Sequence, residues 1–593
     1  MKDKAGSVNV KPGAKACIPF SGGYRLPFPF MAVATQWNLR PMQDDCLASL
    51  DGCGKSPLVR RLLAQRGIRG GDEAERFLNP KLKELGDPFA LPDMEAAVTR
   101  LLRAVDAGES IVIFGDYDVD GVTSLTLLHT LLKAYGLEAR CFLPLRMEEG
   151  YGLSRDGLER CLAEGAVSLL VAVDCGTTAS VETAWLKSRG IDVIILDHHE
   201  PDPARLPDVV ALVNPKCGTG WHYLCSAGVV FKVAHAMMKR RPAEGFDLKA
   251  ELDLVALATV ADIMPLVEEN RLLVRQGLKG LGVTRREGLK ALIHVAGVTE
   301  PYTSMDLGFR LGPRLNAAGR LDTAHAALDL LLCGDACQAG EIARDLDIQN
   351  RERQTLEQQI QAEAVAQAMQ WMVTEIAPQS LVIASRGWHP GVVGIVAARL
   401  MRQFYRPVFV IAVDGDGNGK GSGRSVPGVS LVTALDACRP LLTSGGGHDM
   451  AAGVSLREEN LEAFRAAFAA HVREQTGGTP LEPILHLDAE VRLDELTMDF
   501  LDDYDQLQPF GSGNPQPLFM VRSVYPSAEP RLLRERHWRL ELMQNGTTRT
   551  AMWFNAGGQN LPPAPWDLAF HVDRNTFRGN TTIQLLVQAL RAG

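Results

Sequence analysis

Short apolar runs alternate with stretches of helical periodicity through the first half of the chain. The apolar runs lie at 111–114, 169–173 and 193–196, and the helical stretches between them at 122–135 and 179–189. Apolar strands that alternate with helices are typical of a parallel sheet covered on both faces. The pattern therefore predicts an α/β domain over residues 109–334, preceded by a small helical region at 36–108.

The second half of the chain divides into three kinds of sequence. Residues 341–377 contain neither Gly nor Pro and are rich in Gln, Glu, Ala and Arg, which predicts one long connecting helix at 335–377. A smaller α/β domain follows at 378–478, with two apolar runs, two helical stretches and glycine-rich turns. Residues 479–593 contain short alternating segments and Pro-Gly turns, which predict a small β-barrel.

The composition is that of a folded protein that does not span a membrane. Of the 593 residues, 46% are hydrophobic and 22% are charged, and no apolar run approaches the ~18 residues that a membrane helix needs. The chain has 62 Lys and Arg against 71 Asp and Glu, a net charge of −9. This charge argues against a histone-like protein that binds nucleic acid over its whole surface, but it allows a local basic surface. Eleven cysteines without a C-x-x-C pair indicate reduced thiols in the cytoplasm.

Residues 1–35 do not have the layout of a secretory signal. Their lysines are spread out, and no continuous apolar core follows them before Pro27. We expect a disordered N-terminal extension, and the sequence leaves open whether the natural start is Met1 or Met31.

The densest acidic group directly follows the first predicted strand. Asp116, Asp118 and Asp120 stand at alternate positions, and carboxylates so close together repel one another unless a cation neutralises them. On a strand-to-helix turn they would converge at the carboxyl end of the sheet, where open α/β folds bind ligands. The alternative is a solvated acidic loop. A calcium loop of the EF-hand kind is excluded because the flanks are strand-like and the required Glu is missing.

Three further clusters have a comparable position. Asp174 ends the second apolar run, Asp197-His198-His199 ends the third, and Asp262 closes an otherwise apolar helix. A lone Asp in such a place is often only a helix N-cap. Carboxylates and imidazoles on successive strand ends, however, together suit Mn²⁺, Mg²⁺ or Zn²⁺. The set fits two divalent ions that generate hydroxide and polarise a phosphoryl group.

In this order along the chain, the motifs resemble those of the DHH phosphoesterase superfamily. Three further blocks at 312–320, 421–425 and 445–448 are similar to those of the bacterial RecJ exonucleases, and the similarity extends over residues 36–593. The resemblance implies a parallel-sheet DHH domain, a smaller α/β DHH-associated domain that binds nucleic acid, and a C-terminal OB-fold barrel that binds single strands.

The resemblance also implies the metal ligands. They would be Asp116, Asp118, Asp120, Asp174, His198 and Asp262, holding two ions of Mn²⁺ or Mg²⁺. The expected catalytic residues are Asp118, Asp120, Asp197, His198 and His199. His199 would face the scissile phosphate, and Asp197 would orient its neighbour. Phe114 stands where some relatives have a His, and Cys175, which replaces a common Asn, is interpreted as a buried thiol.

The substrate-binding residues implied by the resemblance form one group in each α/β domain. The first group is Arg146, Arg314, Asn316 and Arg320, and the second is Ser422, Arg424, Gly446, Gly447 and His448. Guanidinium forks and glycine-rich turns both suit phosphate groups. Without the resemblance, the arginines of the first group are better interpreted as ion pairs or helix caps, and the glycine-rich blocks as plain hairpin turns.

Aromatic residues beside basic ones mark two further candidate contacts with DNA. Residues 531–539 combine arginines with Trp538 in a strip typical of backbone tracking and base stacking. The alternative is a solvated strand face with Trp538 in the core. Trp388 offers the same choice between stacking and core packing.

The resemblance implies a two-metal 5′→3′ exonuclease that degrades single-stranded DNA to mononucleotide 5′-phosphates in recombination and repair. Two alternatives are an oligoribonuclease or cyclic-dinucleotide phosphodiesterase of the same superfamily, and a non-catalytic DNA-binding scaffold. Relatives of the first kind lack the barrel, and those of the second have lost several ligands. Single-strand-binding protein and a RecQ-type helicase are candidate partners. The sequence does not identify the physiological metal, processivity, RNA tolerance or oligomeric state.

Overall fold

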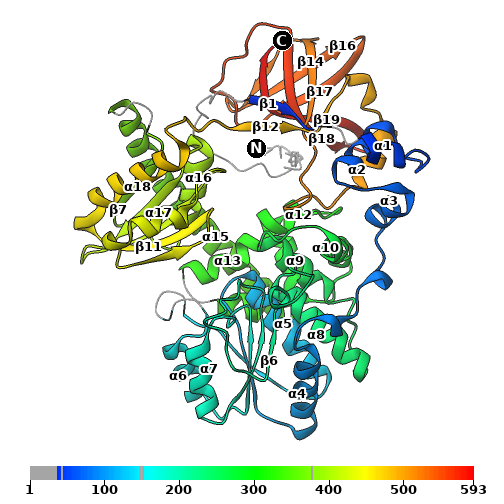
Figure 1. Cartoon of the computed structure of the whole chain (residues 1–593). Helices are drawn as coiled ribbons and strands as arrows, with labels where there is room; N and C mark the ends of the chain where they lie inside the picture. The colour runs from blue at the N-terminus through cyan, green and yellow to red at the C-terminus, as the bar shows by residue number, and fades with distance from the viewer. Residues whose placement is uncertain (1–35, 42–43, 146–148, 150–151, 322–323, 375–377) are drawn as a thin grey trace, which may run out of the picture.

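The computed structural model describes residues 36–41, 44–145, 149, 152–321, 324–374 and 378–593. The expectations for residues 1–35 and for Arg146 lie outside these ranges. Figure 1 shows the first α/β domain at the bottom, the second at the left and the barrel at the top. Within the described ranges, no helix combines the length and the apolar character needed to cross a membrane.

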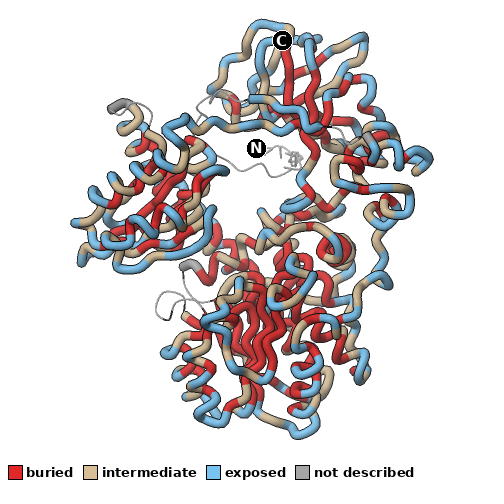
Figure 2. Tube along the Cα trace, viewed as in Figure 1, coloured by how far each residue is buried: buried red, intermediate tan, exposed pale blue. Residues whose placement is uncertain are grey.

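The first domain is built on a parallel sheet in the order β3-β2-β4-β5-β6. Its strands are β2 (Ile111–Phe114), β3 (Arg140–Phe142), β4 (Leu169–Val173), β5 (Asp192–Leu196) and β6 (Ala211–Val213). Every residue of β2 and β4 is buried, as Figure 2 shows for the centre of this domain. The chain passes from β2 to β3 on one side of it and then crosses to β4 on the other side. Such a reversal of strand order opens a crevice at the carboxyl ends of the strands.

Alternate residues of the central strands point into two separate cores. Ile113 and Val171 belong to a core with the helices on one face, and Val112 and Leu170 to a core with those on the other. The first face is covered by α4 (Met94–Ala107), α5 (Val119–Ala134), α8 (Ser226–Arg240) and α9 (Leu252–Ala261), and the second by α6 (Arg155–Ala163) and α7 (Ser180–Ser188). The predicted parallel sheet covered on both faces is therefore confirmed.

A series of helices leads from this sheet to the second domain. They are α10 (Glu268–Leu281), α11 (Glu287–Ala296), α12 (Ser304–Asp306), the π-helical turn η4 (Leu307–Leu311), α13 (Gly312–Leu321), α14 (His325–Leu332) and α15 (Ala336–Thr374). Helix α15 contacts α11, α13 and α14 of the first domain and α16 of the second. The predicted long connecting helix is present, and its last expected residues, 375–377, lie outside the described ranges.

The second domain has a mixed sheet in the order β10-β11-β9-β8-β7. Its elements are β7 (Leu381–Arg386), α16 (Val393–Phe404), β8 (Val408–Val413), β9 (Asn418–Arg424), α17 (Leu431–Ala437), β10 (Ser444–Gly447), β11 (Ala451–Arg457) and α18 (Leu461–Thr476). Phe409 of the sheet packs against Phe464 and Phe468 of α18, with ring centroids 5.5 and 5.0 Å apart. Trp388 is a core residue whose Nε1 donates a hydrogen bond to Glu363 (2.7 Å), so its ring does not form a stacking surface.

The C-terminal domain is a barrel in the strand order β13-β14-β18-β19-β17-β16-β15, closed by pairing between β14 and β16. The strands are β13 (Ala489–Glu490), β14 (Phe519–Pro526), β15 (Arg531–Leu533), β16 (His537–Gln544), β17 (Thr547–Trp553), β18 (Trp566–Phe577) and β19 (Asn580–Ala592), with α19 (Met498–Asp505) against them. Trp538 is half-buried against the core, and its Nε1 donates to the Gln559 carbonyl (3.3 Å). The predicted small barrel is confirmed.

The N-terminal segment packs on this barrel, far from it in sequence. Strand β1 (Gln36–Leu39) pairs in parallel with β12 (Ile484–Leu487), and helices α1 (Asp44–Ser49), α2 (Pro57–Gln65) and α3 (Gly70–Leu78) share the barrel core. Arg271 of α10 joins this assembly to the first domain: its guanidinium donates to the carbonyls of Phe77 (3.0 Å) and Leu507 (2.8 Å). One buried arginine thus donates to carbonyls at the C-terminal ends of two helices, α3 and α19.

Candidate active site

The turn after β2 presents its carboxylates because Asp118 caps the next helix. Its Oδ1 accepts hydrogen bonds from the backbone N–H groups of Asp120 (2.9 Å) and Gly121 (3.2 Å). This cap starts α5 at Val119, three residues before the predicted start at 122. A Cβ at Gly121 would lie 2.3 Å from the Asp116 carbonyl oxygen, so only glycine permits the turn. Asn316 of α13 accepts from the Val119 N–H (3.2 Å) and joins the turn from the side.

The buried carboxylate of Asp120 is held by the N-terminus of α8. Its two oxygens accept from the backbone N–H groups of Ser226 (2.7 Å) and Ala227 (2.8 Å). The Ser226 hydroxyl in turn donates to Asp174 Oδ1 (3.0 Å). Asp174 itself has a left-handed backbone with φ of 61°. Such strain in a non-glycine residue is typical of functional positions that the surrounding structure enforces.

Asp197 is fully buried and organises the two histidines that follow it. Its Oδ1 accepts from the His198 backbone N–H (2.7 Å) and lies 2.7 Å from His199 Nδ1, while its Oδ2 accepts from the Thr177 hydroxyl (2.6 Å). Burial favours the neutral carboxyl, but the hydrogen bond and charge of His199 outweigh it and hold the pKa of Asp197 far below its usual range. Asn214 donates to the His199 carbonyl (2.8 Å) and completes this arrangement.

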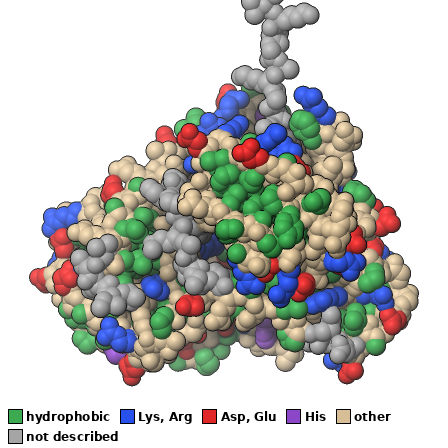
Figure 3. Space-filling view, turned by 90° about the horizontal axis from the view of Figure 1, so that it is seen from above, with side chains coloured by type: hydrophobic (Ala, Val, Ile, Leu, Met, Phe, Trp, Pro, Cys, Tyr) green, Lys and Arg blue, Asp and Glu red, His purple; other side chains and the backbone are tan. Residues whose placement is uncertain are grey.

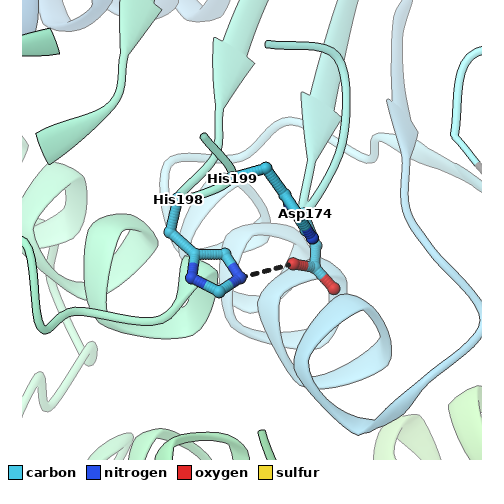
Figure 4. Close-up of side chains that lie close together, drawn as sticks. All are labelled: Asp174, His198 and His199. Carbon is cyan, nitrogen blue, oxygen red and sulfur yellow. Dashed lines mark ion pairs between the residues drawn. The ribbon is translucent and has the colours of Figure 1, made fainter. Parts of the chain in front are cut away.

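The imidazole of His198 is the point at which the separate motifs meet. Its Nε2 lies 3.7 Å from Asp120, 3.5 Å from Asp174 and 3.5 Å from Asp262. Figure 4 shows the ring directed at the Asp174 carboxylate. Three groups have ligand atoms within 4.8 Å of one another: Asp116, Asp118 and Asp174; Asp120, His198 and Asp262; and Asp174, His198 and His199. The structure thus brings together all six of the predicted ligands.

The electrostatics of these carboxylates fit a divalent cation. Burial raises the pKa of Asp174 well above its usual range, and the charges of Asp120 and Asp118 raise it further. Burial and the charge of Asp120 likewise raise the pKa of Asp262 to about 8. Several carboxylates that share one buried site repel one another, and a bound cation reverses this effect. Oxygen ligands with an imidazole are the donor set that suits Mn²⁺ and Mg²⁺.

The fold and this site together define a class of protein, the metal-dependent phosphoesterases with a DHH domain. The DHH family N-terminal domain matches residues 110–259, the DHHA1 domain residues 372–474 and the RecJ OB domain residues 487–589. The single-stranded-DNA-specific exonuclease RecJ of Dickeya dadantii is 37% identical over 94% of this chain and 100% of its own. The chain therefore belongs to the RecJ family of single-stranded-DNA-specific exonucleases.

Other relatives agree with this assignment. RecJ of Bacillus subtilis is 38% identical over 83% of this chain, which spans 62% of that relative. The structure of RecJ from Thermus thermophilus in complex with Mn²⁺ matches with a TM-score of 0.81 and 30% identity, over 94% of this chain and 80% of that chain. The Mg²⁺ complex from the same organism matches with a TM-score of 0.72 and 28% identity, over 94% and 79%.

The predicted substrate residues of the first domain have mixed surroundings. Arg314 forms an ion pair with Asp347 of α15 (2.8 Å), which agrees with the ion-pair interpretation, and Asn316 holds the Asp118 turn. Arg320 lies in α13, and the structure does not describe its side chain. Arg146 is outside the described residues, and the nearby Glu149 forms an ion pair with Arg160 (2.7 Å).

The predicted residues of the second domain lie on β9 and on β10 with its hairpin, on either side of β11 in one sheet. We call Ser422, Arg424, Gly446, Gly447 and His448 the cradle. Arg424 donates to the Ser422 hydroxyl (3.0 Å), and a Cβ at Gly394 of α16 would lie 3.1 Å from that hydroxyl oxygen. The two glycines and His448 are exposed on β10 and its hairpin. A hydrogen bond from Lys216 lowers the pKa of Glu200 against burial, and the charge of His448 lowers it further.

Sequence reasoning missed three residues that support the site. Ser226, Thr177 and Asn214 hold Asp174, Asp197 and the His199 carbonyl. None belongs to a cluster of acidic or histidine residues. Ser226 had one usable signal, because a Ser at the start of an apolar helix is a favoured N-terminal residue.

Proposed function

We propose that the chain degrades single-stranded DNA from the 5′ end to mononucleotide 5′-phosphates, with two divalent ions, in cytoplasmic DNA recombination and repair. The observation that carries this proposal is the convergence of His198 on Asp120, Asp174 and Asp262 at the carboxyl edge of the sheet. When bound, Mn²⁺ or Mg²⁺ supplies Lewis-acid polarisation of the phosphoryl group and an activated water.

Two of the ligand groups support two ions rather than one. Asp116, Asp118 and Asp174 form one group, and Asp120, His198 and Asp262 form the other, so no residue is common to the two. Asp174 Oδ1 of the first group lies 3.5 Å from His198 Nε2 of the second group. Two adjacent sites of this kind clamp the attacking and leaving oxygens of a phosphoryl transfer.

We infer that His199 acts on the substrate and is not only a metal ligand. Asp197 fixes its Nδ1, so its Nε2 can donate a hydrogen bond to a phosphate oxygen. The Asp197 carboxylate acts through His199 by fixing the orientation of the ring.

The 5′ direction is supported by the cradle of the second domain. Arg424 and Ser422 lie beside the N-terminal turn of α16, where backbone N–H groups and a guanidinium suit a terminal phosphate. We expect a terminal phosphate held there to lie beyond the scissile bond from the metal ligands.

The barrel is proposed to hold the rest of the single strand. Arg531, Arg534 and Arg539 are exposed on β15, β16 and the turn between them, beside the exposed Leu532 and Leu533. Figure 3, which views the molecule from the barrel side, shows basic side chains beside a gathering of hydrophobic ones. Positive charge next to apolar surface suits a backbone with unstacked bases. Single-strand-binding protein and a RecQ-type helicase are proposed as partners on the same processing pathway.

Digestion of end-labelled oligonucleotides tests the function. With Mn²⁺ or Mg²⁺, a 5′ label on single-stranded DNA should appear at once as mononucleotide, whereas a 3′ label should shorten progressively. Blunt duplex DNA should resist, and a chelator should stop the reaction. Early release of the 3′ label would reverse the proposed polarity. Preferred cleavage of dinucleotides or cyclic dinucleotides would instead favour the phosphodiesterase alternative.

A further inference from the structure

Ile263, directly after the predicted metal ligand Asp262, has a backbone conformation that its side chain disfavours. Helix α9 ends in a Schellman motif, in which the Met264 N–H donates to the Thr259 carbonyl (3.0 Å) and the Ile263 N–H to the Val260 carbonyl (3.2 Å). Ile263 occupies the left-handed position of this motif, with φ of 59°. Glycine is usual there, and a β-branched residue is a clear outlier.

The strain is not offset by packing, because the Ile263 residue is 74% exposed. Two apolar residues of the elements next to α9 are exposed as well, Met305 (53%) of α12 and Phe309 (41%) of η4. Helix η4 lies against the last turn of α9, since a Cβ at Gly308 would lie 3.3 Å from Val260 Cγ1. We call Ile263, Met305 and Phe309 the apolar rim. Exposed apolar residues grouped beside a polar site mark a binding surface.

The apolar rim lies between the metal centre and the barrel. On the barrel side, the Leu266 N–H donates to the Ser512 carbonyl (2.7 Å), and the Ser304 hydroxyl donates to the Phe510 carbonyl. Figure 1 shows α12 on the side of the first domain that faces the barrel. A strand that runs from the barrel to the metal centre therefore reaches the rim before the ligands.

We propose that Ile263 packs against the face of the nucleobase next to the scissile phosphate and is a specificity-determining residue for unpaired DNA. The proposal rests on the proposed function, because it requires the phosphate at the ligands beside Asp262. Every base has an apolar face, so the contact is independent of sequence. In a duplex that face is stacked on its neighbours, so the contact selects unstacked DNA.

The test compares the wild-type chain with Ile263→Gly and Ile263→Asn, both of which suit the left-handed position. The melting temperature of neither variant should fall below that of the wild type, and that of Ile263→Gly should rise. The value of kcat/KM on a single-stranded oligonucleotide should drop on the order of tenfold in both, because one buried aliphatic contact is lost. A residue with a merely structural role would not combine greater stability with lower activity.

Oligonucleotides with one abasic nucleotide identify the contact. At one position near the 5′ end, the abasic substitution should remove the difference between the wild type and Ile263→Gly. At other positions the difference should remain. Tyr405→Gly is the matched control, because Tyr405 has φ of 48° at the end of α16 and lies outside the site. It should leave kcat/KM unchanged.

Two results would overturn the inference: unchanged kcat/KM in Ile263→Gly, or a defect that is equal on intact and abasic substrates at every position. Both presuppose a wild-type chain that digests the intact oligonucleotide from its 5′ end. If the wild type fails to do so, the proposed function is the part that is wrong.

Discussion

The metal centre and the cradle of the second domain are built in opposite ways. In the metal centre, Asp120 and Asp174 are buried, and backbone N–H groups and a hydroxyl hold their oxygens before any substrate arrives. In the cradle, Gly446, Gly447 and His448 are exposed, and Arg424 donates to the Ser422 hydroxyl and to the Gly423 carbonyl rather than to a carboxylate. One site is preorganised, whereas the other leaves its donors open to an incoming phosphate.

The difference indicates a division of roles. Preorganised charge lowers the barrier of the chemical step, because no reorganisation is needed during reaction. An open cradle that binds a remote phosphate instead contributes substrate positioning. Variants of the metal centre should therefore affect turnover, and variants of the cradle should affect the choice of DNA end.

Loss of a predicted ligand should give the largest effect. Asp120→Ala should reduce hydrolysis by about a thousandfold or more, because the ions lose an oxygen ligand that faces His198. Binding of single-stranded DNA should change little, since the cradle and the barrel remain. Initial rates and fluorescence anisotropy measure the two quantities. Asp345→Ala, at an exposed position of α15, is the control. Near-normal turnover in Asp120→Ala would contradict the assigned site.

The comparison also shows how far sequence reasoning reaches. The runs that became β2, β4 and β5 carry their ligands at the strand ends, so strand pattern and acidic spacing together predicted where the ligands meet. Ser226 could not be predicted in the same way, since its role depends on where α8 begins in space. The packing of α2 on the barrel could not be predicted either. The pattern of an amphipathic helix shows that one face is buried, but it does not show which element covers that face.

Ser226→Ala sharpens the comparison within the metal centre. The backbone N–H bond to Asp120 remains, but Asp174 loses the hydroxyl at 3.0 Å. Groups that orient metal ligands typically contribute about 10–100-fold to metal affinity. The Mn²⁺ concentration for half-maximal activity should rise by that factor, with near-normal kcat at saturating Mn²⁺. Ser188→Ala, which removes an exposed hydroxyl at the end of α7, should leave the Mn²⁺ dependence unchanged.

Variants of the cradle should change the preference between 5′-phosphate and 5′-hydroxyl ends of the DNA rather than the turnover number. Arg424→Ala should remove most of the preference for a 5′-phosphate over a 5′-hydroxyl end. A charge-assisted hydrogen bond contributes about 1.5–3 kcal/mol, so the wild-type preference should be on the order of tenfold to a hundredfold. Rates on paired oligonucleotides with either end measure it, with Arg402→Ala of α16 as the control. An unchanged preference in Arg424→Ala would leave only the metal centre assigned.

The barrel should give the smallest effect, and one that depends on salt. Deleting residues 484–593 is a poor test, because α1–α3 share the barrel core and would lose their packing. Substituting Arg531, Arg534 and Arg539 with Ala instead removes three exposed positive charges, one of which, that of Arg539, also pairs with Glu541 (2.9 Å). For single strands, each neutralised phosphate contributes about 0.7 to the slope of log affinity against log salt, so the slope should fall by roughly 2.

Affinity measured for long and short oligonucleotides distinguishes this barrel effect from general weakening. At moderate salt, long strands should bind a few-fold less tightly, whereas short oligonucleotides that reach only the metal centre and the cradle should be unaffected. The control is Arg492→Ala with Arg522→Ala, because both arginines are exposed in the barrel domain and lie outside β15, β16 and the turn between them. A salt slope equal to that of the wild type in the triple variant would place the DNA path away from β15 and β16. It would leave the apolar rim beside Asp262 as the entry to the metal centre.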